Sequence, residues 1–128
     1  MPATMVDVNV SDFEEAFQKL KSEVAHKKFL LFLADKDPAS SLSWCPDCNV
    51  AEPVIYQKLT ASSYKVAVLR AFVGDEATWG NPAHPWRVDP RFLVKGVPTL
   101  ILWENGDITG RLEEDEAHLE DKIDALLK

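Results

Sequence analysis

Hydrophobic residues follow two kinds of spacing along this chain, and each kind predicts a different element. Residues 5–10 predict a short first strand. Five apolar residues then recur at helical spacing: Phe13, Ala16, Phe17, Leu20 and Val24. They predict the core-facing side of a helix that runs to about residues 24–26. Ser11 and Glu14 have the S-x-x-E form of a capping box, so we expect them to start this helix.

Two longer apolar runs have the character of strands that are buried on both faces. Residues 29–34 are continuously apolar and bounded by charge, as in a parallel sheet covered by helices on either side. Residues 65–73 predict a third strand of the same kind, and residues 99–103 a fourth. Asn105-Gly106 favours a tight hairpin turn, so residues 108–112 are expected to return as a fifth strand.

A second helix is predicted after the polar loop of residues 35–43. Pro46 fits its first turn, where a missing N–H is harmless, whereas Pro53 should kink it. Its apolar face consists of Ala51, Val54, Ile55 and Leu59. A last helix carries Leu119, Ile123, Leu126 and Leu127 on one face. The acidic residues 113–116 are expected at the N-terminus of that helix, where the macrodipole favours negative charge.

The element order is therefore β-α-β-α-β-loop-β-β-α, which predicts an α/β domain with a mixed central sheet of about five strands between helix layers. The loop of residues 74–90 is the least regular part and contains Trp79 and Trp86. Long loops in compact domains are often functional. One hypothesis is therefore that this loop is a docking surface for a signalling partner, with redox state as a switch of affinity.

Composition narrows the possible functions. The 128 residues are 46% hydrophobic and 27% charged, with a net charge of −7. This acidic balance disfavours nucleic acid and anionic membranes as partners. No apolar stretch reaches the roughly 18 residues of a membrane span. The first residues lack the basic and apolar regions of a signal peptide, so secretion is not expected.

The only two cysteines lie in Trp44-Cys45-Pro46-Asp47-Cys48. Two thiols three positions apart can close a disulfide if a helix starts between them, which makes the pair a candidate redox centre. The alternative is half of a zinc site. One C-x-x-C motif supplies only two of the usual four ligands, and no second Cys/His pair follows, so no metal site is expected.

Four features of the sequence, taken together, resemble the pattern of the thioredoxin family. They are Trp-Cys-x-x-Cys after a buried strand, Pro53 five residues beyond the second cysteine, Gly96-Val97-Pro98-Thr99 at a strand entrance, and Asn105-Gly106. The resemblance spans nearly the whole chain, so residues 1–128 are interpreted as a single thioredoxin-like domain.

Other residues are similar to one subgroup of that family, thioredoxin domain-containing protein 17. They are the Pro-Asp pair between the cysteines, Ala51-Glu52-Pro53-Val54, Val73-Gly74-Asp75, Trp79, Asn81-Pro82 and Trp86-Arg87. The resemblance implies a cytosolic disulfide reductase without a bound cofactor. Its electrons would come from NADPH through thioredoxin reductase, and its substrates would be small molecules or proteins that contain disulfides.

Separate roles are expected for the two cysteines. Cys45 at a helix N-terminus should have a pKa below the free value of ~8.5 and act as the nucleophile. Cys48, one turn into the helix, should be more buried and resolve the mixed disulfide. Pro46 and Asp47 should set the redox poise, although the direction of the Asp47 effect stays open.

Three further residues are expected around the thiols. Trp44 either forms a rim on which substrate lies or simply packs against the fold. By resemblance, the Val97–Pro98 bond is cis and faces the motif. Val97 would then offer its backbone to an extended substrate, and Pro98 would keep metal away from the thiols.

One departure from ordinary thioredoxin concerns the resolving cysteine. Thioredoxin has a buried acid on its second strand, whereas Leu31 falls at or near that position here. Asp47 and Glu52 are the alternatives for activating Cys48, with Glu52 ranked second because a simply solvated side chain is an equally open interpretation of it. His84 is the histidine considered for the site; His26 and His118 are expected at the surface.

Overall fold

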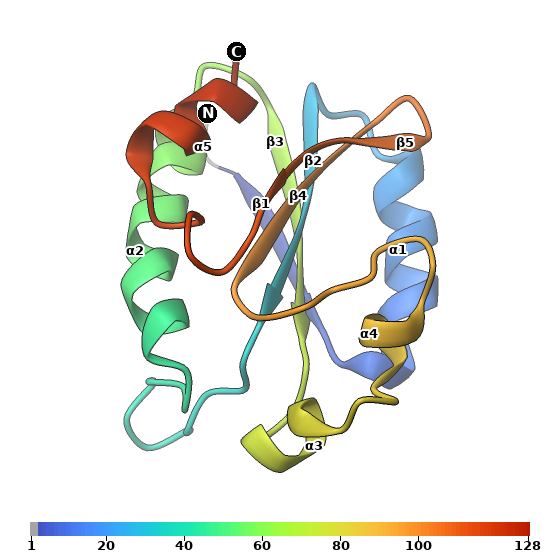
Figure 1. Ribbon diagram of the computed structural model, residues 1–128. Helices are drawn as coiled ribbons and strands as arrows, with labels where there is room; N and C mark the ends of the chain where they lie inside the picture. Colours follow the sequence, from blue (N-terminus) through green and yellow to red (C-terminus); the bar gives the residue numbers. More distant parts are fainter. Residues whose placement is uncertain (1–2) are drawn as a thin grey trace.

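A single five-stranded sheet forms the centre of the computed structural model, which describes residues 3–128 (Figure 1). Its strands are β1 (Thr4–Val8), β2 (Lys27–Leu33), β3 (Val66–Phe72), β4 (Thr99–Glu104) and β5 (Asp107–Leu112). They lie in the order β1-β3-β2-β4-β5. The first three strands are parallel to one another, β4 is antiparallel to β2, and β5 is antiparallel to β4. The predicted mixed sheet is therefore confirmed.

Helices cover both faces of the sheet, as the sequence predicts. On one side lie α2 (Pro46–Ala61) and α5 (Glu120–Leu126) (Figure 1). On the other lie α1 (Phe13–Ser22) and α4 (Pro85–Val88), with α3 (Glu76–Gly80) below the end of β3. Across residues 3–128, no helix combines the length and the apolar character needed to cross a membrane.

Strand β2 occupies the middle of the sheet, and this position explains why its sequence is apolar. It pairs with β3 on one side and with β4 on the other, and residues 29–33 are fully buried. Helices cover both faces of the strand, so neither face contacts solvent and the sequence is continuously apolar instead of alternating between apolar and polar residues. The Asn105-Gly106 hairpin is also confirmed, since both residues adopt the positive φ angles (54° and 81°) that such a turn requires.

The predicted start of α1 is wrong. Asn9, rather than Ser11, supplies the cap: its Oδ1 accepts the N–H of Asp12 at 3.2 Å and the Ser11 hydroxyl at 2.7 Å. This cap begins a 3₁₀ turn over Val10–Asp12, and α1 continues from it. Glu14 is not part of a capping box, because its carboxylate pairs with Arg91.

Two predicted helix boundaries also need correction. Helix α1 ends at Ser22 because Glu23 is extended, which leaves Val24 85% exposed although its spacing fits the apolar face. The acidic residues 113–116 form a separate turn before α5, in which Glu116 accepts the Glu113 N–H at 3.2 Å. The acidic residues in the first turn of α5 are instead Glu120 and Asp121.

Helix α2 continues through Pro53 from Pro46 to Ala61. The proline ring faces solvent, so the apolar face of the helix is unaffected. Ala51, Ile55 and Leu59 are buried on that face, as predicted.

The long segment of residues 74–90 is ordered by its aromatic residues. Trp79 and Trp86 are only 5% and 3% exposed, and His84 lies between them. The His84 Nε2 lies 2.9 Å from the Val73 carbonyl oxygen, and its Nδ1 accepts the Trp86 N–H at 3.1 Å. Both ring nitrogens are thus occupied by backbone groups, and burial lowers the pKa of His84. Neither of these bonds reaches a cysteine, so the structure gives no support to the hypothesis that His84 serves the redox site.

We predict that the aromatic cluster under α1 dominates stability. Phe13 contacts four aromatic rings with centroid distances of 5.2 to 6.2 Å, those of Phe17, Phe32, Trp86 and Phe92. Phe13→Ala should lower the free energy of unfolding by about 3–5 kcal/mol, because it leaves a cavity. Val24→Ala should change it by less than about 0.5 kcal/mol. Urea unfolding of both variants measures the difference, and equal effects would contradict this assignment of the core.

Candidate active site

The two cysteines lie at the start of α2, where the helix has unpaired backbone amides. Cys45 is the N-cap residue, and its Sγ accepts the N–H of Cys48 at 3.2 Å. Pro46 follows at the first helical position, where no N–H is needed. Both thiols are free; Cys45 is 7% exposed and Cys48 is completely buried. The predicted difference in burial between the two is confirmed.

This placement gives the two thiols opposite acidities. The pKa of Cys45 is lowered from 9.0 to about 7, first by a hydrogen bond from the Cys48 thiol and then, against the cost of burial, by the Cys48 amide. The pKa of Cys48 is raised, because its thiol donates that same hydrogen bond and because it is buried. Cys45 is therefore the group that ionises near neutral pH, and Cys48 stays protonated beside it.

Asp47 acts on Cys45 in two opposing ways. Its carboxylate, exposed to solvent, raises the pKa of the Cys45 thiol, whereas its backbone amide lowers that pKa. The effect of the charge is the larger of the two. The Asp47 charge therefore works against the Cys45 thiolate.

Val97 and Pro98 face the dithiol from the opposite side. The Val97–Pro98 peptide bond is cis, as the family resemblance implies. The Cys45 Sγ–H donates to the Val97 carbonyl oxygen at 3.4 Å. Beyond it, the buried Thr99 hydroxyl donates to the Gly96 carbonyl oxygen at 2.7 Å and holds the entrance to β4. The backbone at Val97 thus lies in contact with the reactive sulfur.

Trp44 connects the motif to the end of β3. Its indole Nε1–H donates to the Gly74 carbonyl oxygen at 3.0 Å, and the ring is half-buried. A groove of about 540 Å³ opens beside it, lined also by Lys36, Leu42, Ser43 and Asp75. Trp44 therefore packs against the fold and borders an open groove at the same time.

Asn49 is a structural residue of the site that the sequence patterns do not reveal. Its Oδ1 accepts the Ser43 N–H and its Nδ2 donates to the Ser43 carbonyl oxygen, both at 3.0 Å. The Ser43 hydroxyl lies 3.1 Å from both the N and O atoms of Cys45. Asn49 thus fastens the incoming loop to the helix that carries the thiols.

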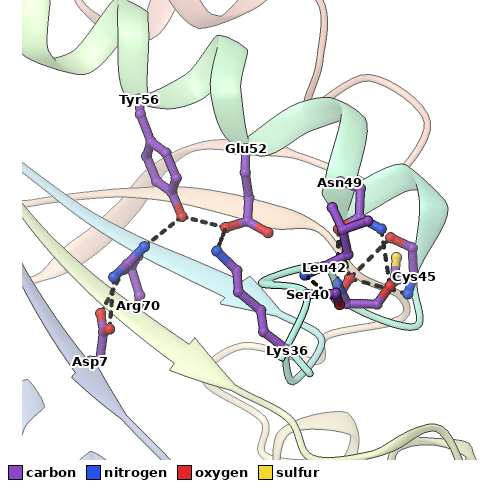
Figure 2. Close-up of polar contacts among 10 residues, drawn as sticks. Asp7, Lys36, Ser40, Leu42, Cys45, Asn49, Glu52, Tyr56 and Arg70 are labelled. Atoms are coloured by element: carbon purple, nitrogen blue, oxygen red, sulfur yellow. Dashed lines mark hydrogen bonds and ion pairs between the residues drawn. The ribbon is translucent and has the colours of Figure 1, made fainter. Parts of the chain in front are cut away.

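Glu52 is buried, which excludes the alternative of a simply solvated side chain. It is 4% exposed, and its Oε1 lies 2.8 Å from the Lys36 Nζ and accepts the Tyr56 hydroxyl at 2.7 Å (Figure 2). Position 31 on β2 is a fully buried leucine, as the sequence indicates. No group of three or more His, Cys, Asp or Glu side chains in residues 3–128 is arranged to hold a metal ion.

The mixed sheet, the helix that begins at a cysteine pair and the facing cis-proline define a thioredoxin fold, and solved structures agree. Thioredoxin O1 from Arabidopsis thaliana, in its oxidized state, superposes with a TM-score of 0.61 over all of both chains at 18% identity. Trxlp from Edwardsiella tarda EIB202 gives a TM-score of 0.61 at 20% identity, covering 90% of this chain and 94% of that one.

Sequence comparison identifies the subgroup. The family described as thioredoxin domain-containing protein 17-like, thioredoxin domain, matches residues 9–128, and this chain belongs to it. Thioredoxin-like protein Clot from Oryza sativa subsp. japonica is 53% identical over 99% of this chain and 97% of that one. Thioredoxin domain-containing protein 17 from Homo sapiens is 35% identical over 76% of each chain. The predicted resemblance is confirmed, and it supports a thiol-disulfide oxidoreductase type of function.

The pKa of Cys45 predicts how its reactivity depends on pH. Alkylation of the reduced protein should rise as pH increases through about 7, because the thiolate is the reactive form. About half of the Cys45 thiols should then be ionised at pH 7, against a few per cent for an ordinary cysteine. Peptide mass spectrometry after brief iodoacetamide treatment should find the label on Cys45 and not on Cys48. A midpoint equal to that of the urea-unfolded chain would contradict the assignment.

We further predict that Asn49→Ala loosens the site. The variant loses both hydrogen bonds to Ser43, so the free energy of unfolding should fall by about 1–2 kcal/mol. Alkylation of Cys45 at pH 7 should also become slower, because the loop no longer holds its backbone. The exposed Gln57 lies on the same helix, and Gln57→Ala is the control that should leave both measurements unchanged. If the two variants behave alike, Asn49 has no positioning role.

Proposed function

We propose that this protein is a protein-disulfide reductase that cycles between the Cys45/Cys48 dithiol and an internal disulfide. The observation that carries the proposal is the placement of Cys45, with a pKa of about 7, at the N-terminus of α2 and against the Val97 backbone. Cys48 lies protonated and buried one turn behind it. A reactive thiolate with a protected second thiol is what two-step disulfide reduction requires.

The reaction proceeds in two exchanges. The Cys45 thiolate attacks one sulfur of the substrate disulfide, the other substrate sulfur leaves as a thiolate, and a mixed disulfide forms. Cys48 then loses its proton and attacks the Cys45 sulfur. The bond between Cys45 and substrate breaks, the second substrate thiolate leaves, and Cys45 and Cys48 become joined. Two electrons have then passed from the protein to the substrate.

The acidity of Cys45 favours reduction over oxidation as the direction of use. A strongly acidic nucleophile stabilises the dithiol form and makes an oxidant, as in DsbA, whereas thioredoxin has a pKa near 7. The pKa of Cys45, about 7, is close to that of thioredoxin, which is a reductase. The charge of Asp47 contributes by opposing further acidification.

Thioredoxin reductase and NADPH are the proposed electron source, and the cytosol is the proposed location. Membership of the thioredoxin domain-containing protein 17-like family supports both. The substrates would be disulfides of small molecules or proteins that can reach Cys45 beside Trp44 and the groove. The alternative hypothesis, a docking surface on residues 74–90, loses its motivation because Trp79 and Trp86 are buried.

The test compares cystine and insulin as substrates, side by side, with NADPH and thioredoxin reductase as the source of electrons. The wild-type protein should consume NADPH, and Cys45→Ser should show only the background rate. Cys48→Ser should accumulate a mixed disulfide on Cys45, which non-reducing mass spectrometry detects. Turnover of Cys45→Ser equal to wild type would sink the proposal, and adducts on Cys48 in Cys45→Ser alone would reverse the two roles.

A further inference from the structure

Glu52 is a buried charge on the helix that carries the dithiol. The sheet offers no acid at position 31, and Cys48 is completely buried, so its proton needs an acceptor inside the protein. Helix α2 supplies a carboxylate four residues after Cys48, and both residues are buried. The reductase reaction does not otherwise use this group.

Helix geometry brings the carboxylate towards the thiol. Residues four apart lie on the same face of a helix, with Cβ atoms about 5–6 Å apart. Helical side chains lean towards the N-terminus, which directs the Glu52 side chain towards the turn that holds Cys48. In agreement with this placement, the Glu52 charge acts on the Cys48 thiol. Tyr56, four residues after Glu52, has the same orientation: its hydroxyl points back towards the N-terminus and donates to the Glu52 carboxylate at 2.7 Å. Cys48, Glu52 and Tyr56 therefore form one row along the buried side of α2.

Charged and polar groups from three other elements support this carboxylate. Lys36, in the loop after β2, pairs with Glu52 at 2.8 Å, and its side chain is 32% exposed. From β3, the Arg70 Nη1–H donates to the Tyr56 hydroxyl at 2.9 Å. Asp7 on β1 in turn accepts from Arg70 at 2.6 and 2.7 Å (Figure 2). The row thus ends in a chain of bonds that crosses the sheet.

Stability alone gives little reason for such an arrangement. Taking a carboxylate out of water is costly, and replacing a buried ion pair with apolar residues is often neutral or stabilising. The Glu52 charge also raises the pKa of Cys48, so it disfavours the resting thiolate of the resolving cysteine. A group that only tuned the charge around Cys48 would therefore slow the resolving step.

We propose that Glu52 is the base that takes the proton of Cys48 during the resolving step, with Lys36 and Tyr56 holding its carboxylate in place. The inference rests on the proposed reductase function. In this step the Cys48 S–H proton passes to the Glu52 carboxylate as the Cys48 sulfur attacks Cys45. The Cys45–substrate S–S bond breaks, its electron pair leaves with the substrate thiolate, and the protein disulfide forms. The proton then passes from Glu52 to solvent beside Lys36, whose side chain is partly exposed.

A chromophoric aromatic disulfide, dithiobis-nitrobenzoate, separates the two steps of a single turnover. Attack by Cys45 releases the first coloured thiolate, and resolution by Cys48 releases the second. Glu52→Gln should leave the first phase near the wild-type rate and slow the second on the order of 100-fold at pH 7. At alkaline pH the difference should shrink, because hydroxide can then take the Cys48 proton in place of Glu52.

The direction of change distinguishes the possible roles of Glu52. If its charge only repels the Cys48 thiolate, Glu52→Gln should speed the second phase at pH 7, and that result would overturn the proposal. An unchanged second phase would overturn it as well. Absence of the first phase in the wild-type protein would instead reject the reductase function on which the inference rests.

Matched variants exclude a merely structural effect. Glutamine has nearly the size of glutamate and can still accept the Tyr56 hydroxyl, so Glu52→Gln should keep the fold. Glu52→Asp retains the carboxylate and should restore part of the second-phase rate. The 69%-exposed side chain of Glu120 pairs with Lys58 of the same helix α2, so Glu120→Gln is the control and should change neither phase. An equal slowing in Glu52→Gln and Glu120→Gln, at every pH, would also overturn the proposal.

Discussion

The hydrogen bond from the Cys48 amide to the Cys45 sulfur is the contact on which the site depends. It satisfies one of the free amides that every helix start leaves, and it places a polarisable sulfur where a serine or aspartate would ordinarily cap. The same contact makes the start of α2 reactive, because the groups that stabilise the helix end also stabilise a thiolate. Helix formation and thiol chemistry are in this way one structural feature.

The remainder of the fold holds that helix end against a fixed backbone. Strand β2 is buried on both faces and pairs on both sides, so it leads the chain into the active-site loop from a rigid position. Strand β4 pairs with β2 and begins directly after the cis-proline. The active-site loop follows β2 and the cis-proline precedes β4, so two neighbouring strands of one sheet bring the Cys45 sulfur and the Val97 carbonyl group together.

Features that depend on a local pattern could be predicted from the sequence. The apolar run of β2, the Asn105-Gly106 turn and the first-turn proline each have a local physical cause. The placement of polar side chains could not be predicted, because it depends on partners distant in the chain. Glu52 looks solvated until Lys36 is found beside it, and Asn49 acquires a role only when the loop at Ser43 returns to the helix. Val24 fits the helical period, but the helix ends before it.

The contact between Trp44 and Gly74 makes two distant positions dependent on each other in evolution. Gly74 has φ +103°, and a Cβ atom there would lie 2.9 Å from the Thr78 methyl carbon, so the position resists any side chain. Its carbonyl oxygen in that conformation is the acceptor for the indole beside Cys45. A mutation at residue 74 would therefore displace the hydrogen-bond acceptor of Trp44, beside Cys45. Substitutions at positions 44 and 74 are for this reason expected to depend on each other.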